Sequence, residues 1–182
     1  VLALPSIDHG DPAILRYLGE YYLYHTGQFD VAVYCSEDLV HWEKLGTALR
    51  ASDEPGHWAG IDLWAPEVIY ADGRFYMYVT GALRVNGKAD DNVRRIGVAV
   101  ADRPEGPFTL SPEPLTTEWS IDAHPFQDSD GSWYMYCNVR NSATLGPHGV
   151  IGCGNYVDKM IDFQTLQNKP TLVCKPESHW EG

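Results

Sequence analysis

Three acidic residues, Asp11, Glu67 and Asp122, stand ahead of three similar aromatic segments of this chain, each with a proline close by. They lie far apart in the sequence, but each leads into the same kind of segment. Carboxyl groups that meet at one site can divide the roles of general base and general acid, because their surroundings set their pKa values apart. Whether these three meet depends on the elements that follow them.

The aromatic segments are copies of one pattern. Each begins with glycine and continues with alternating aromatic and apolar residues, at residues 19–24, 73–78 and 131–136. The three glycines are separated by 54 and 58 positions. Short alternating stretches bounded by turn residues fill the remaining chain, and helical periodicity is hard to find. The pattern predicts an all-β fold built from repeated small sheets.

Each repeat has the size of one β-propeller blade. We therefore predict that residues 1–182 form a partial β-propeller, with blade I at about 11–50, blade II at about 64–115 and blade III at about 120–175. We place the aromatic segment first in each blade, and in blade III we expect further strands at residues 150–153 and 171–174. Asp11, Glu67 and Asp122 then occupy the loops that enter these first strands, at the mouth of one channel.

Charge narrows the class of partner. The chain has 182 residues and a net charge of −12, from 13 basic and 25 acidic residues, and it has no run of Lys or Arg. Nucleic acids and anionic membrane surfaces are poor partners for such a protein. No apolar run reaches the length that spans a membrane. A neutral polar ligand such as a carbohydrate fits this charge.

The four cysteines show no paired C-x-x-C spacing, so we predict no zinc site. We also predict no other metal and no cofactor. Cys35 and Cys137 lie in strand-like runs, where a free thiol behaves as a small hydrophobe. A disulfide between distant strands stays open. The compartment, secreted or cytoplasmic, also stays open because a signal peptide can be removed during maturation.

Five motifs, in order, carry a resemblance to a known family. They are Asp11-Pro12-Ala13-Ile14, Ser36-x-Asp38-Leu39-x-x-Trp42, Trp64-Ala65-Pro66-Glu67-Val68, Gly97-Val98-Ala99-Val100-Ala101-Asp102-x-Pro104-x-Gly106-Pro107-Phe108, and Ile121-Asp122 followed by Asp128-x-Asp130-Gly131. Together they resemble glycoside hydrolase family 43, and they cover nearly the whole chain. The resemblance implies a five-bladed β-propeller that cleaves arabinose- or xylose-containing glycans with inversion, of which three blades are recognisable here.

The resemblance also assigns roles to two of the acids. Asp11 matches the general base, which activates water, and Asp122 matches the carboxylate that orients the general acid and raises its pKa. The family's general acid is a glutamate in the fourth blade, usually within Glu-Gly-Pro, and no such sequence follows residue 140. Neither Glu177 nor Glu181-Gly182 matches it. We therefore expect a chain that stops after three blades and lacks its acid, so that self-association or a missing C-terminal part closes the propeller.

Further residues near the three acids are candidates for substrate binding. Trp58, Trp64 and Trp119 can stack on a sugar ring, although a tryptophan in a propeller is as often a core residue. Glu67 can contact substrate, and His124 lies on the same face of a strand as Asp122, two residues earlier. The segment Asp128–Gly131 is too short for a calcium loop and predicts a tight turn.

Two alternative functions remain beside the glycosidase. The first is a propeller that binds carbohydrate without catalysis. The second is a glycoside phosphorylase, which relies on a single acidic residue and on basic groups that hold phosphate. The basic candidates for that phosphate site are Arg94, Arg95 and Arg140.

Overall fold

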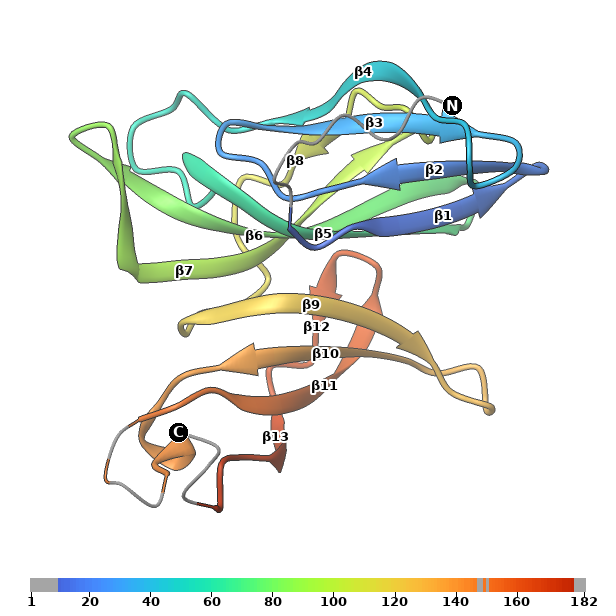
Figure 1. Cartoon of the computed structure of the whole chain (residues 1–182). Coiled ribbons are helices and arrows are strands. Elements are labelled where there is room, and N and C mark those ends of the chain that lie inside the picture. Colours follow the sequence, from blue (N-terminus) through green and yellow to red (C-terminus); the bar gives the residue numbers. More distant parts are fainter. Residues whose placement is uncertain (1–9, 147–148, 150, 179–182) are drawn as a thin grey trace.

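The computed structural model describes residues 10–146, 149 and 151–178 of the chain. Their regular structure is almost entirely β, in three antiparallel sheets that follow one another along the chain (Figure 1). The prediction of an all-β propeller fold is therefore confirmed, and we name the three sheets, with their connections, blades I, II and III in chain order. Among the described residues, the single helical element is the 3₁₀ turn η1 (Ser142–Thr144).

Blades I and II have the same simple order, each strand pairing with the next. Blade I consists of β1 (Ala13–Tyr17), β2 (Glu20–Tyr24), β3 (Asp30–Ser36) and β4 (Glu43–Arg50). Blade II consists of β5 (Ile61–Ala71), β6 (Arg74–Val85), β7 (Lys88–Ala101) and β8 (Thr109–Leu110).

Blade III repeats this order and adds a strand. It consists of β9 (Ser120–Gln127), β10 (Trp133–Val139), β11 (Gly154–Asp162) and β12 (Thr165–Leu166), and β13 (Thr171–Cys174) also pairs with β11. The expected strand at residues 150–153 is not found at residues 151–153, since β11 begins only at Gly154 and Ile151 forms an isolated bridge with Leu145; Val150 lies outside the described residues. The Asp128–Gly131 segment is the predicted tight turn, closed by a bond from Gly131 N to Asp128 O of 2.9 Å.

The aromatic segment is the second strand of each blade, not the first. In all three blades another strand precedes it, namely β1, β5 and β9, which we call the leading strands. The sequence does not reveal them by alternation, because a proline and acidic residues interrupt β5 and β9, and β1 has only five residues. Leading strand β5 packs against β1 on one side and β9 on the other, so blade II lies between the other two (Figure 1).

The aromatic pattern is explained by burial on both faces of the second strand. In β6, Phe75, Met77 and Val79 pack into the core shared with blade I, while Tyr76 and Tyr78 pack into the core shared with blade III. Successive side chains of a strand point to opposite faces. A central blade therefore needs apolar residues at every position of this strand.

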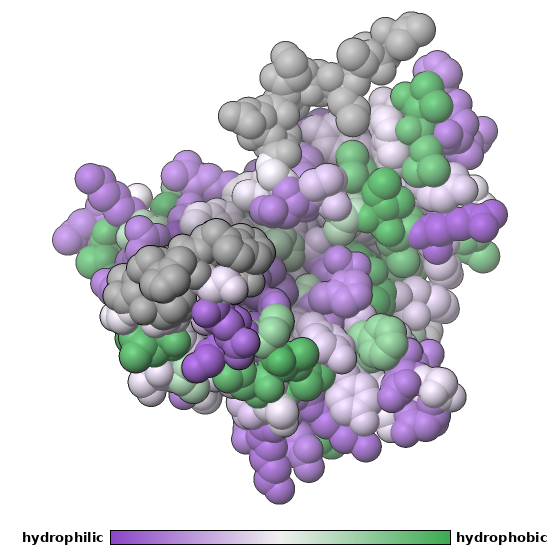
Figure 2. All heavy atoms as spheres, turned by 60° about the horizontal axis from the view of Figure 1, so that its bottom comes forward, coloured by the Kyte–Doolittle hydropathy of each residue, from purple (hydrophilic) through white to green (hydrophobic). Residues whose placement is uncertain are grey.

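The last tyrosine of the pattern also joins neighbouring blades. The hydroxyl of Tyr24 donates to Pro104 O of blade II at 2.6 Å, and that of Tyr78 donates to Phe163 O of blade III at 3.0 Å. The matching Tyr136 of blade III is 38% exposed and packs edge-on against Phe126. Figure 2 brings this end of the molecule forward and shows hydrophobic side chains in several groups separated by hydrophilic ones.

Candidate active site

One pocket of about 220 Å³ is lined by three successive residues of each blade, which lie in the leading strand or just before it. Its lining consists of Asp11, Pro12 and Ala13 from blade I, Ala65, Pro66 and Glu67 from blade II, and Asp122, Ala123 and His124 from blade III. We call it the acidic pocket. The structure thus brings together four of the six predicted site residues, Asp11, Glu67, Asp122 and His124.

The three contributions are equivalent by register as well as by position. Asp11, Ala65 and Asp122, the bend residues, all have positive φ angles of 55°, 43° and 60°. The residue before each bend lies opposite the residue seven positions after a repeat glycine. These pairs are Gly10 with Thr26, Trp64 with Thr80, and Ile121 with Asn138. In blade II, the residue equivalent to the two aspartates is therefore Ala65, not Glu67.

Both aspartates are exposed, and each accepts a hydrogen bond from the residue that lies opposite the position before its bend. The Thr26 hydroxyl donates to Asp11 Oδ2 at 2.6 Å, and Asn138 Nδ2 donates to Asp122 Oδ2 at 2.8 Å. The Asn138 amide is oriented in turn by Asn155, whose Nδ2 donates to Asn138 Oδ1. Thr26 and Asn138 were not among the predicted site residues, although their constant distance from the repeat glycines was a signal that could have found them.

Glu67 and His124 occupy matching places two residues after their bends and face each other. His124 Nδ1 lies 3.9 Å from Glu67 Oε2. Burial raises the pKa of Glu67 above its ordinary value, while the nearby His124 acts in the opposite direction and offsets part of that increase. The pocket therefore contains carboxyl groups in different environments, which is the condition for dividing acid, base and binding roles.

The tryptophans lie outside the pocket lining. Trp58 is 6% exposed, its ring rests on Gly97, and its Nε1 donates to Ser111 O at 3.0 Å. This placement does not support the prediction that Trp58 contacts substrate, because its ring is buried in the core between blades I and II. Trp64 directly precedes Ala65 and is half-buried, and the Arg94 guanidinium covers its ring at 3.4 Å.

Trp119 and Arg94 belong to one polar cluster behind Trp64. Arg94 is 3% exposed and forms ion pairs with Asp62 and Asp91, and Trp119 Nε1 donates to Asp91 O at 2.8 Å. The two aspartates balance the charge of the buried guanidinium, which in turn packs on the ring of Trp64.

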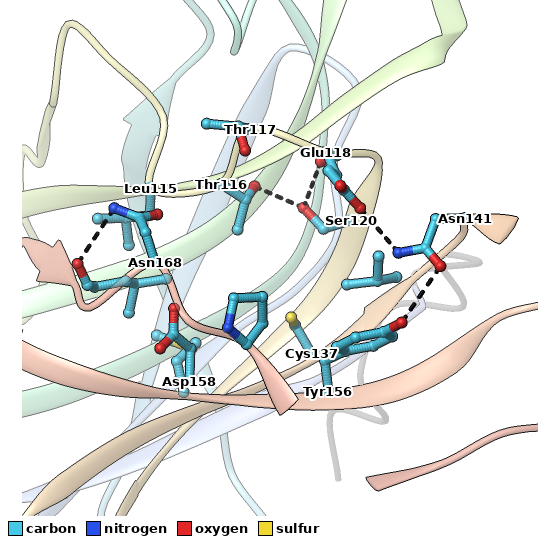
Figure 3. A pocket seen from close by; sticks show the side chains of 14 residues that line it. Leu115, Thr116, Thr117, Glu118, Ser120, Cys137, Asn141, Tyr156, Asp158 and Asn168 are labelled. Atoms are coloured by element: carbon cyan, nitrogen blue, oxygen red, sulfur yellow. Dashed lines mark hydrogen bonds between the residues drawn. The ribbon is translucent and has the colours of Figure 1, made fainter. Parts of the chain in front are cut away.

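A second cavity, of about 270 Å³, lies between the connection from blade II to blade III and the sheet of blade III (Figure 3). Its polar side chains pair with one another: Thr116 with Ser120, and Asn141 with both Glu118 and Tyr156. Burial raises the pKa of Cys137 in its wall to about 12, so this thiol stays protonated at neutral pH. We favour the acidic pocket as the functional site, because its carboxyl groups converge from three blades.

Within the described ranges, no group of three or more His, Cys, Asp or Glu residues is arranged to hold a metal ion. All four cysteines are free thiols in the structure. No helix in the part of the chain described here is long and apolar enough to cross a membrane. Glu181-Gly182, considered above for the general acid, lies outside the described residues.

Comparison with known proteins gives the family. The model of glycosyl hydrolases family 43 matches residues 4–180, and the chain belongs to this family. It is 41% identical over 113 residues to xylosidase/arabinosidase 43A of Humicola insolens, a match that covers 62% of this chain and 31% of that protein. The chain spans less than half the length of curated relatives such as this one and the xylosidase/arabinosidase of Bacteroides ovatus.

Solved structures agree in fold over nearly the whole chain. A thermostable family-43 glycoside hydrolase has a TM-score of 0.79 and 34% identity, over 96% of this chain and 55% of that one. CoXyl43, a β-xylosidase/α-arabinofuranosidase from a compost metagenome crystallised with xylotriose, has a TM-score of 0.71 and 25% identity, over 92% of this chain and 61% of that one.

Proposed function

We propose that this chain carries the water-activating part of a glycosidase site for arabinose- or xylose-containing glycans. Asp11 is the general base, Asp122 orients the general acid and raises its pKa, and the general acid is supplied from outside this chain. The observation that carries the proposal is the acidic pocket, in which two hydrogen-bonded aspartates at equivalent bends face one space. Relatives named as xylosidase/arabinosidase support the substrate class.

The chemistry follows from the environment of each group. Inverting hydrolysis needs a carboxylate that takes a proton from water and a carboxylic acid that protonates the leaving oxygen, on opposite sides of the sugar. Asp11 accepts a bond from a neutral hydroxyl and Asp122 from a neutral amide, so no cation in these contacts neutralises either carboxylate. Glu67, half-buried beside His124, is placed to accept a hydrogen bond from a sugar hydroxyl.

The decisive experiment compares turnover and binding by the chain itself. Aryl arabinofuranoside and aryl xyloside are the hydrolysis probes, and xylotriose and arabinotriose are the binding probes. We expect measurable oligosaccharide binding, weakened at least about tenfold by Asp122→Ala, with little or no hydrolysis, because leaving-group protonation contributes about 10²–10⁴-fold in rate. Hydrolysis abolished by Asp11→Asn would show that the chain holds its own acid.

The same experiment separates the two alternatives. Binding without turnover, even when further chain or a partner protein supplies a glutamate, would favour a propeller that only binds carbohydrate. A phosphorylase would require phosphate-dependent turnover. Of its three basic candidates, Arg94 is already paired with two aspartates and stacked on Trp64, and Arg140 is stacked on Trp119, which speaks against a phosphate site at these two residues.

A further inference from the structure

Thr26 joins a carboxylate of blade I to the backbone of blade II. Its hydroxyl donates to Asp11 Oδ2 at 2.6 Å, and the same oxygen accepts a bond from Ala65 N at 2.9 Å. A hydroxyl has one proton and two lone pairs, so both bonds form at once with complementary directions. The bond from the amide fixes the hydroxyl such that its proton points to Asp11.

Thr80 occupies the matching place in blade II and makes the matching link to blade III. Its Oγ1 accepts a bond from Asp122 N at 3.1 Å, and the side chain is fully buried. Blade II has alanine at its bend, so Thr80 has no bend carboxylate of its own blade to hold. Its hydroxyl serves only the bend of the next blade.

Both links reach the chain where it is strained and leaves its sheet register. The pairing of β5 with β6 shifts between Trp64 and Glu67, and the pairing of β9 with β10 shifts at the residues that follow Ile121. A non-glycine residue with left-handed backbone is strained and persists only where its surroundings hold it. At Ala65 and Asp122, the surroundings that accept the bend amide are the threonines of the preceding blade.

We propose that Thr26 and Thr80 are positioning residues, which set where the carboxylates of the acidic pocket stand relative to one another. Each threonine fixes the bend of the following blade, and Thr26 also fixes the Asp11 carboxylate. The geometry of the pocket is then transmitted from blade to blade by one hydroxyl at each junction. The proposal uses the proposed function only for the roles of Asp11 and Asp122, and its geometric part stands without them.

The test is made on the full chain labelled with ¹⁵N and ¹³C, with Thr26→Val, Thr26→Ser and their Thr80 counterparts. Valine keeps the shape and removes the hydroxyl, whereas serine keeps it. We expect Thr26→Val to speed amide exchange of Ala65 about five- to tenfold and to shift the side-chain carboxyl ¹³C resonance of Asp11, with Asp122 N unaffected. Thr80→Val affects Asp122 N instead. Both serine variants restore the parent values.

Thr47 provides a matched control, because its hydroxyl donates to Asp30 Oδ2 at 3.1 Å in blade I, outside the acidic pocket. Thr47→Val leaves the Ala65 and Asp122 amides unchanged. The proposal is overturned if Thr26→Val leaves Ala65 exchange unchanged, or if all three valine variants speed both amides equally, as uniform destabilisation does. Should buried Thr80→Val fail to fold, half-buried Thr26 decides the matter alone.

Xylotriose binding supplies the functional readout. We expect Thr26→Val to weaken it about three- to tenfold and Thr26→Ser to restore it, because the pocket keeps its residues but loses their alignment. If the parent chain binds no sugar, the proposed function fails while the exchange result still decides the role of the threonines. If the parent binds and Thr26→Val binds equally well, the hydroxyl does not position the site.

Discussion

Blade II differs from blades I and III at the residue that matters most for chemistry. All three blades make the same left-handed bend, but Asp11 and Asp122 occupy it in the outer two and Ala65 in the central one. Two residues later the relation is reversed, since blade I has Ala13 where the others have Glu67 and His124. The fold therefore repeats the same backbone positions in each blade, and different side chains at those positions can take different roles in the site.

The largest loss of stability that we expect comes from disturbing the core between blades I and II, which supports the central blade. In Gly97→Ala the new methyl group overlaps the Trp58 ring, which is buried between blades I and II. Overpacking of this kind costs about 1–3 kcal/mol. Urea unfolding should show that loss of stability, and titration calorimetry should show weaker xylotriose binding. Gly10→Ala, with no heavy atom within 4 Å of its new methyl group, should change stability by less than about 0.5 kcal/mol.

The fold class could be predicted because the aromatic strands are buried on both faces, which leaves a strong pattern such as residues 75–79. The leading strands could not be found this way. At Ala65-Pro66 the backbone bends and the strand register shifts, so the alternation that identifies a strand is lost there. The strand expected at residues 150–153 failed for a related reason, since an apolar run alone does not fix where pairing begins.

For the candidate site, the types of residue predicted more than the alignment of the three repeats did. A carboxylate beside a proline pointed to Asp11, and the repeat pointed to Asp122. The same reasoning aligned Glu67 with them, because only the backbone shows that Ala65 occupies the equivalent bend. The placement of Trp58 in the core was equally unreadable, since a buried and a sugar-stacking tryptophan have the same local sequence.

A second experiment removes the difference between the blades. Ala65→Asp gives all three bends an aspartate, and aspartate adopts left-handed backbone more readily than alanine. The added charge joins Asp11, Glu67 and Asp122, so we expect a loss of about 0.5–1 kcal/mol at pH 7 that largely disappears near pH 4. Ala65→Asn is the uncharged control. Equal pH profiles for the two variants would mean that the carboxyl groups do not sense one another.

A smaller effect isolates the backbone of the central bend. Ala65→Gly relieves the left-handed conformation without touching a charged group, and we expect a gain of about 0.5 kcal/mol with unchanged xylotriose binding. Asp122→Gly should relieve the same strain and abolish binding. Thermal unfolding and titration calorimetry of the two variants measure both effects. Loss of binding in Ala65→Gly would show that the bend must be stiff as well as correctly placed.

The smallest effect concerns the pair that distinguishes blades II and III from blade I. Burial raises the pKa of Glu67 in the folded state, so the native protein binds more protons than the unfolded chain between the two pKa values. Stability is therefore highest below the ordinary pKa of glutamate and falls as pH rises through the raised one. The side chain is 35% exposed and therefore screened by solvent, so we expect less than about 0.5 kcal/mol.

Glu67→Gln removes this titration, so its stability relative to the parent should increase between pH 4 and pH 7. His124→Gln acts in the opposite sense, because it removes the neighbour that lowers the pKa of Glu67, and it should steepen the fall of stability over the same range. The double variant should lose the slope contributed by the pair. Urea unfolding at several pH values measures all three. If His124→Gln leaves the slope unchanged, the two side chains 3.9 Å apart are not coupled, and matching position alone does not make them a functional pair.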